Sequence, residues 1–101
     1  MKEELVELIC EALIELNEDM FEQPALTNPK AKTYLFGPKG QLDSQGLVAL
    51  IVAVEDKVEE RYGQEVTIAD ERAMSQKISP FIRVDRLAAY VEKLIQEAGD
   101  G

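Results

Sequence analysis

Residues 35–63, LFGPKGQLDSQGLVALIVAVEDKVEERYG, decide the fold of this chain. A loop interrupted by glycine and proline gives way after Asp43 to a long apolar stripe, and Gly63 stands where a helix ends in a glycine cap. The stripe keeps helical spacing and is too long for a typical strand. Its members are Leu47, Val48, Leu50, Ile51, Val54, Val58 and Tyr62. The stretch therefore predicts a helix that starts at Asp43-Ser44 and buries this stripe, Val48 included.

The start of this helix carries the most distinctive chemistry of the chain. Ser44 presents a hydroxyl where the first N–H groups of a helix lack intrahelical partners and where the helix dipole is positive. A phosphodiester on Ser44 would be electrostatically favoured there. The step Asp43-Ser44-Gln45-Gly46 is therefore the leading candidate for a functional site.

On the N-terminal side the sequence predicts another helix and a long loop. Apolar residues recur at three and four residues from Leu5 to Leu16, with glutamates between them, which indicates an amphipathic helix of about four turns. Residues 23–42 lose this period and contain three prolines and two glycines. A loop this long is usually packed or functional. We expect its apolar residues to fold back onto the core: Leu26, Tyr34, Leu35 and Phe36.

On the C-terminal side, residues 64–68 predict a turn that brings Val66 and Ile68 to the core. Residues 69–77 predict a short third helix, with Met74 and Ile78 inward, that ends at Ser79-Pro80. The last helix fades at Gly99 and buries one apolar face: Val84, Leu87, Ala88, Val91, Leu94 and Ile95. The expected architecture is all-α, a single four-helix bundle over residues 1–101 with three longer helices, a short third one and a long loop between the first two.

Composition narrows the classes of function. The chain has 101 residues, of which 46% are apolar, and its 20 acidic against 11 basic residues give a net charge of −9. This charge disfavours nucleic acid and anionic membranes as partners and favours basic protein surfaces. The sequence contains no signal peptide and no apolar span of about 20 residues. We expect a cytoplasmic monomer without stable membrane insertion.

The lack of histidine and the presence of a single cysteine narrow the possible functions further. The chain has no histidine, which removes the usual general base near neutral pH and every Ser-His or His-metal site. One cysteine, Cys10, allows no intrachain disulfide or multi-cysteine metal site, and packing is its simplest role. We therefore expect a protein that is not an enzyme and has no metal site of its own. A hydrolase that uses Ser44 is disfavoured, since no base or oxyanion hole is evident.

The helix order together with Asp-Ser at the head of the second helix resembles the acyl carrier protein family over nearly the whole chain. Asp43-Ser44 matches the family's attachment motif, and the residues that follow at the expected offsets are Val48, Ile51, Val54 and Glu55. The resemblance implies that Ser44 carries 4′-phosphopantetheine, transferred from coenzyme A by a phosphopantetheinyl transferase. It also implies that the arm's thiol holds acyl or aminoacyl groups as thioesters.

The resemblance also assigns roles and partners around this serine. Asp43 would cap the second helix and lie near the transferase metal during loading. Partner contacts would involve Gln45, Gly46, Leu47, Ala49 and Asp56. The partners would be an acyl-loading ligase or synthase and acyl-using enzymes of fatty-acid-like, polyketide or other specialised biosynthesis.

Two departures from the family pattern point to a specialised carrier. Gln45 replaces the usual leucine after the serine, and Ala49 and Ala53 stand where many members carry acids. Lys57 adds a positive charge further along, so docking through a purely acidic second helix is in doubt. Gln45 also supports the alternative function, a helical protein–protein adaptor that keeps the fold but lacks the arm.

Some residues keep two interpretations. Gly46 either relaxes the first helical turn or leaves room for the arm. The segment Tyr34-Leu35-Phe36 either pins the loop to the core or contacts a partner. Residues 1–22 hold eight acids and one lysine, which form either a solvated face, a docking surface for a basic partner or a weak divalent-cation site.

Overall fold

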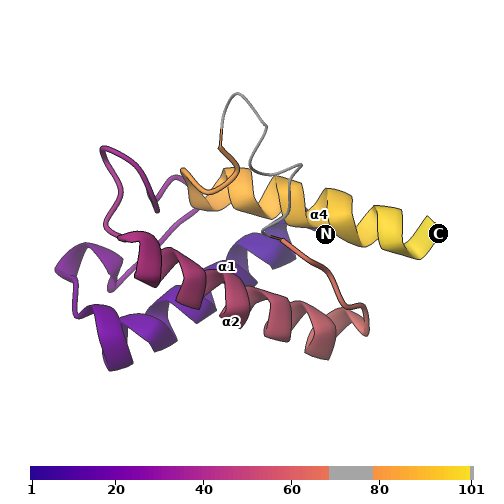
Figure 1. Ribbon diagram of the computed structural model, residues 1–101, viewed down its shortest axis with the longest axis horizontal. Coiled ribbons are helices and arrows are strands. Elements are labelled where there is room, and N and C mark those ends of the chain that lie inside the picture. Colours follow the sequence, from indigo (N-terminus) through magenta and orange to yellow (C-terminus); the bar gives the residue numbers. More distant parts are fainter. Residues whose placement is uncertain (69–78, 101) are drawn as a thin grey trace.

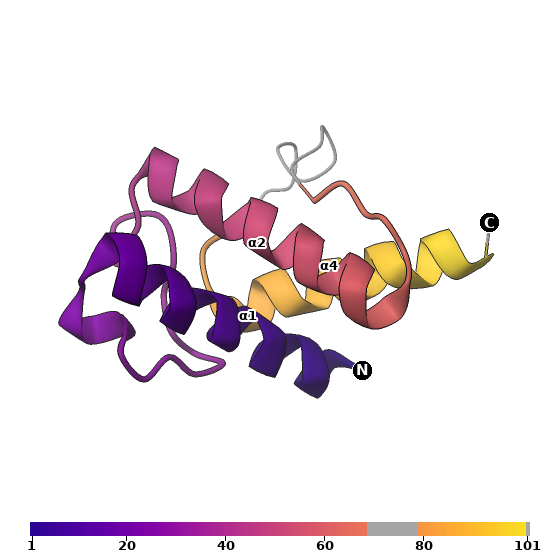
Figure 2. The same ribbon diagram turned by 90° about the horizontal axis from the view of Figure 1, so that it is seen from below.

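Three α-helices form the body of the protein in the computed structural model, which describes residues 1–68 and 79–100. They are α1 (Lys2–Leu16), α2 (Ser44–Tyr62) and α4 (Val84–Asp100). α1 runs antiparallel to α2 and α4 and contacts both (Figures 1 and 2). Within the described ranges there is no strand. The predicted all-α fold is confirmed for these residues, whereas the short third helix expected over 69–77 lies outside them.

α1 buries the predicted stripe and has the predicted length of about four turns. The helix begins at Lys2, and after Leu16 the chain continues in a π-helical turn, Asn17–Phe21, followed by a short 3-10 turn, Pro24–Leu26. Leu5, Leu8, Ile9, Ala12 and Leu13 are buried. The apolar period stops at Leu16, so nothing in the sequence pattern signalled the additional turn.

α2 has the two ends that the sequence predicts. The Asp43 carboxylate caps its N-terminus, and Gly63 ends it in the left-handed conformation at φ 68°, with its N–H donating to the Glu59 carbonyl at 2.9 Å. Such a cap favours glycine because a side chain is strained at positive φ. The buried face consists of Gly46, Leu50, Ile51, Val54 and Val58.

The long loop between α1 and α2 is packed and tied to the segment that leads into α4. Leu26 and Leu35 have no exposed surface, which confirms the prediction that they fold back onto the core. Four backbone hydrogen bonds, with the N–H donor named first, join the loop to residues 81–85: Leu35 to Ile82 (2.8 Å), Phe36 to Phe81 (3.2 Å), Val84 to Thr33 (3.0 Å) and Asp85 to Ala31 (2.8 Å). These bonds satisfy loop backbone groups that burial would otherwise leave unpaired.

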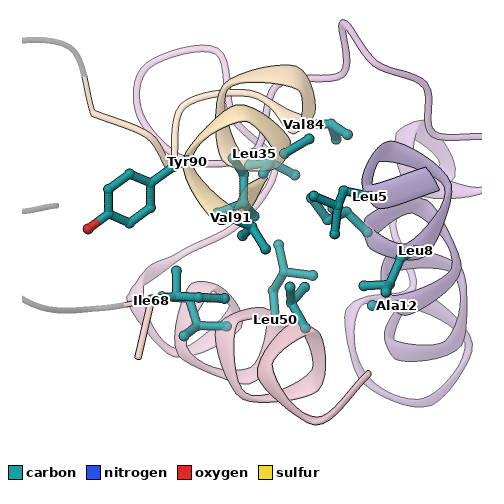
Figure 3. Close-up of a cluster of buried hydrophobic side chains, with 14 of the residues drawn as sticks. Leu5, Leu8, Ala12, Leu35, Leu50, Ile68, Val84, Tyr90 and Val91 are labelled. Carbon is teal, nitrogen blue, oxygen red and sulfur yellow. The ribbon is translucent and has the colours of Figure 1, made fainter. Parts of the chain in front are cut away.

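The core lies where the three helices, the loop and residues 66–68 converge. Figure 3 shows Leu5 of α1, Leu35 of the loop, Leu50 of α2 and Val91 of α4 pointing toward one another. Ile68 joins them, and Val66 is also buried, as predicted. Burying each such side chain contributes roughly 1.5–3 kcal/mol, so the loop is stabilised by the same core as the helices.

Candidate functional site

Ser44 is the first residue of α2, and its side chain is exposed. The preceding residue, Asp43, has extended backbone, and its Oδ1 accepts the Gly46 N–H at 2.7 Å. Its carbonyl accepts the Leu47 N–H at 2.9 Å. This is the capping role expected of Asp43. It fixes the first turn of α2 and leaves the hydroxyl of Ser44 at the positive end of the helix dipole.

Gly46 is buried, and its neighbours give the reason for glycine at this position. A Cβ there would lie 3.2 Å from Cε1 of Phe21, 3.3 Å from Oδ1 of Asp43 and 3.5 Å from Cδ2 of Leu42. The space beside Gly46 is therefore occupied by the protein itself, and above all by the ring of Phe21. Neither interpretation left open by the sequence included this contact.

The outer face of α2 begins at Ser44 and continues through two exposed valines. Val48 is 60% exposed and Val52 51% exposed, so the assignment of Val48 to the core is wrong. Helical geometry explains the correction, because steps of four residues keep Ser44, Val48 and Val52 on one side of α2. The side chains that face the core are offset from this row and belong to Leu50, Ile51, Val54 and Val58.

The residues predicted to contact partners are spread over two faces of α2. Gln45 and Asp56 are exposed, and Ala49 is half-buried. Leu47 is half-buried and packs against the core, while Gly46 is buried. The outer face therefore combines Ser44 and Gln45 with two valines and Asp56.

The basic side chains of α2 turn toward α1. Lys57 Nζ lies 3.0 Å from Glu15 Oε2, and Arg61 Nη2 lies 3.7 Å from Glu11 Oε2. The charged pocket along this seam, about 330 Å³, is lined by Glu11, Lys57, Glu60 and Arg61. The positive charge of Lys57 is thus paired with α1. Lys57 therefore adds no unpaired positive charge to the outer face, whose acidic residue is Asp56.

A second pocket, of about 200 Å³, opens beside the start of α2. Its lining combines apolar and polar side chains from the end of α1, the loop and α2: Met20, Phe21, Gln23, Gln41, Leu42, Asp43 and Gly46. The sequence did not single out Met20 or Phe21, because they follow the last residue of the apolar stripe and only the fold brings them to the start of α2, beside Asp43 and Gly46.

Other chemistry is weak in the described part of the chain. Cys10 is half-buried. Burial, and to a lesser extent the nearby Glu7 carboxylate, raises the pKa of its thiol, so the thiol stays protonated near neutral pH. Among residues 1–68 and 79–100, no group of three or more acidic or cysteine side chains is arranged to hold a metal ion. Across these same residues, no helix is both long and apolar enough to cross a membrane.

Comparisons with protein-family models, with curated proteins and with solved structures gave no match to this chain.

Proposed function

We propose that this protein is a carrier that holds acyl or aminoacyl intermediates as thioesters on a 4′-phosphopantetheine arm attached to Ser44. The observation that carries the proposal is the exposed Ser44 hydroxyl at the capped start of α2. A phosphate group at this position is favoured by the unpaired N–H groups of the first turn and by the helix dipole. The proposed role is transport of bound intermediates between enzymes.

Loading requires a phosphopantetheinyl transferase and coenzyme A. The Ser44 oxygen forms a phosphodiester bond with the phosphorus that bears pantetheine, and the pyrophosphate bond to adenosine 3′,5′-bisphosphate breaks. The hydroxyl proton passes to a base of the transferase. An acyl-loading ligase or synthase then charges the arm's thiol, and downstream enzymes of fatty-acid-like, polyketide or other specialised biosynthesis consume the thioester.

The outer face of α2 is the proposed surface for these partners. Val48 and Val52 lie on the same side of the helix as Ser44, and Asp56 adds negative charge. A partner that covers the valines would bring its active site to the arm, whose tether raises the local concentration of the acyl group without tight binding. Gln45, next to the serine, makes this surface more polar than leucine would, in keeping with a specialised set of partners.

The exposed valines also favour the second candidate, a helical adaptor without an arm. Such a protein would use the same face for stable binding. The two functions differ at Ser44, because only the carrier needs its hydroxyl.

The test is loading in solution. Purified protein is incubated with coenzyme A and a broad-specificity transferase, and its intact mass is measured. The carrier gains one phosphopantetheine group and Ser44→Ala gains none, whereas Ser79→Ala, which changes another exposed serine, gains it like the unmodified chain. Absence of the gain with several transferases would favour the adaptor.

A further inference from the structure

The turn that follows α1 is held by a buried asparagine. Asn17 is 7% exposed and is the buried polar side chain among the described residues. Its Nδ2 donates to the Gln23 carbonyl at 3.1 Å, and its Oδ1 accepts the Gln23 N–H at 2.8 Å. Between Asn17 and Gln23 the chain forms the π-helical turn Asn17–Phe21 and then passes through Glu22, whose φ is 50°. We call this pair of hydrogen bonds the Asn17 clasp.

The Asn17 clasp determines where Phe21 lies. The Asn17 amide pairs with both the N–H and the carbonyl of Gln23, and this selects a single geometry, because another would leave the polar atoms of a buried side chain unpaired. Phe21 is the last residue of the π-helical turn, and its ring packs against the core and faces Gly46. The clasp therefore holds the Phe21 ring against the first turn of α2.

The contact at Gly46 reaches Ser44 through the cap. Gly46 donates its N–H to Asp43, the residue before Ser44, so the glycine contacts both the Phe21 ring and the capping carboxylate. A shift of the ring changes the space available to this turn, which includes Ser44. Val48 and Val52 lie about one and two turns beyond Ser44 along α2 and are exposed on its outer face.

We propose that Asn17 and Phe21 are positioning residues for attachment of the arm to Ser44. The inference rests on the proposed carrier function and adds to it the elements that aim the serine. Displacement at phosphorus requires the attacking oxygen to be oriented, and a misplacement of about 1 Å can cost up to ~100-fold in rate. The clasp and the ring would supply that orientation from outside α2.

The measurement is the steady-state kinetics of loading, with kcat and KM determined separately for the carrier as substrate. Asn17→Ala and Phe21→Ala should lower kcat by about tenfold while KM changes little, because the outer face that binds the transferase is intact. A merely structural defect gives the opposite split, since partial unfolding lowers the concentration of competent substrate and raises the apparent KM. Folding of each variant is checked by circular dichroism.

A matched control removes a hydrogen bond at the far end of α1. Tyr62 donates to Glu4 Oε2 at 3.0 Å, and Tyr62→Phe deletes this bond while sparing the start of α2. Its kcat and KM for loading should equal those of the unmodified chain.

A compensating pair tests the contact itself. Gly46→Ala introduces a Cβ against Cε1 of Phe21 and should lower kcat, whereas Phe21→Leu lacks that atom. The double variant should therefore load faster than Gly46→Ala alone, because residues in contact give non-additive effects.

Unchanged kcat in folded Asn17→Ala and Phe21→Ala, or no recovery in the double variant, would overturn the inference while the carrier function stands. Failure of the unmodified chain to load would instead overturn the carrier function and the inference with it.

Discussion

At the scale of single residues, the capping carboxylate of Asp43 organises the site. It satisfies the Gly46 N–H at 2.7 Å, so the first turn of α2 is formed before any partner arrives. Pre-formed geometry lowers the entropic cost of presenting a nucleophile to another enzyme. The cap therefore matters for stability and for loading together.

Because the Asp43 carboxylate stabilises the helix, Asp43→Ala should lower the stability of the protein. Loss of the cap should lower the free energy of unfolding by about 1 kcal/mol, within the range of ~0.5–2 kcal/mol found for N-caps. Urea titration measures it. Asp43→Asn is the matched control, because its amide oxygen can still accept the N–H. Equal stability of the alanine variant and the unmodified chain would contradict the assigned cap.

Asp85, in the first turn of α4, predicts a pH dependence. Burial alone would raise the pKa of Asp85, but hydrogen bonds from Arg83, at 2.6 Å, and from Lys32 outweigh it and lower the pKa below its usual 3.8. The Asp85 carboxylate therefore binds a proton more readily in the unfolded chain than in the folded protein. The stabilisation is complete above pH ~4 and is lost as the pH falls through the lower folded-state value.

The expected observation is a stability gap that closes in acid. Asp85→Asn should be less stable than the unmodified chain at pH 7, and the difference should shrink below about pH 4. Chemical unfolding at a series of pH values measures this gap. Asp56→Asn, which changes an exposed carboxylate, serves as control. A gap of constant size from pH 7 to pH 2 would rule out the ion pair as its cause.

At the scale of elements, α1 and α2 meet along a seam with an acidic side and a basic side. Lys57 and Arg61 of α2 reach Glu15 and Glu11 of α1 at a largely exposed surface. Exposed ion pairs contribute little to stability, and salt screens them. The main effect of the seam is on the distribution of charge, because it turns the bases of α2 away from the outer face.

Glu15→Gln should accordingly lower the free energy of unfolding by only ~0.2–1 kcal/mol at low ionic strength. In 1 M salt, where the screening length is about 3 Å, the difference should nearly vanish. Urea unfolding of the variant and of the unmodified chain, at low salt and in 1 M salt, measures this difference. Glu7→Gln changes an exposed acid of the same helix outside the seam and is the control. A loss that persists in high salt would mean that Glu15 stabilises the fold through packing and not through its charge.

The elements also show which parts of the site were predictable. Both ends of α2 followed from local signals, the capping Asp43 and the left-handed Gly63. The place of Val48 did not, because an almost continuous apolar run does not say which side faces the core. The Asn17–Phe21 turn and its contact with Gly46 left no periodic signal, since they depend on a chain reversal that only the tertiary structure specifies.

At the scale of the whole molecule, the long loop is an integral part of the core. It joins α1 to α2 and forms hydrogen bonds with residues 81–85 at and before the start of α4. It also contributes Leu26 and Leu35 to the core, and Figure 3 shows Leu35 between the helices. A small domain has little core to spare, so loop residues contribute as much as helical ones. The start of α2 is held in place because this loop is held.

Leu35→Ala should therefore lower the free energy of unfolding by about 2–5 kcal/mol, as for a buried leucine in a helix. The comparison is with Leu50→Ala in α2 and with Asn28→Ala, an exposed loop residue expected to change stability by less than ~0.5 kcal/mol. A cost for Leu35→Ala no larger than that for Asn28→Ala would show that the loop does not support the core.

The measurement that tests the central claim most directly is the mass of one tryptic peptide after incubation with coenzyme A and transferase. Cleavage after Lys39 and Lys57 releases residues 40–57, in which Ser44 is the one side chain with a hydroxyl group. The account predicts that this peptide gains the mass of one phosphopantetheine and that the mass of every other peptide is unchanged. An unmodified peptide 40–57, or a gain on a different peptide, would contradict it.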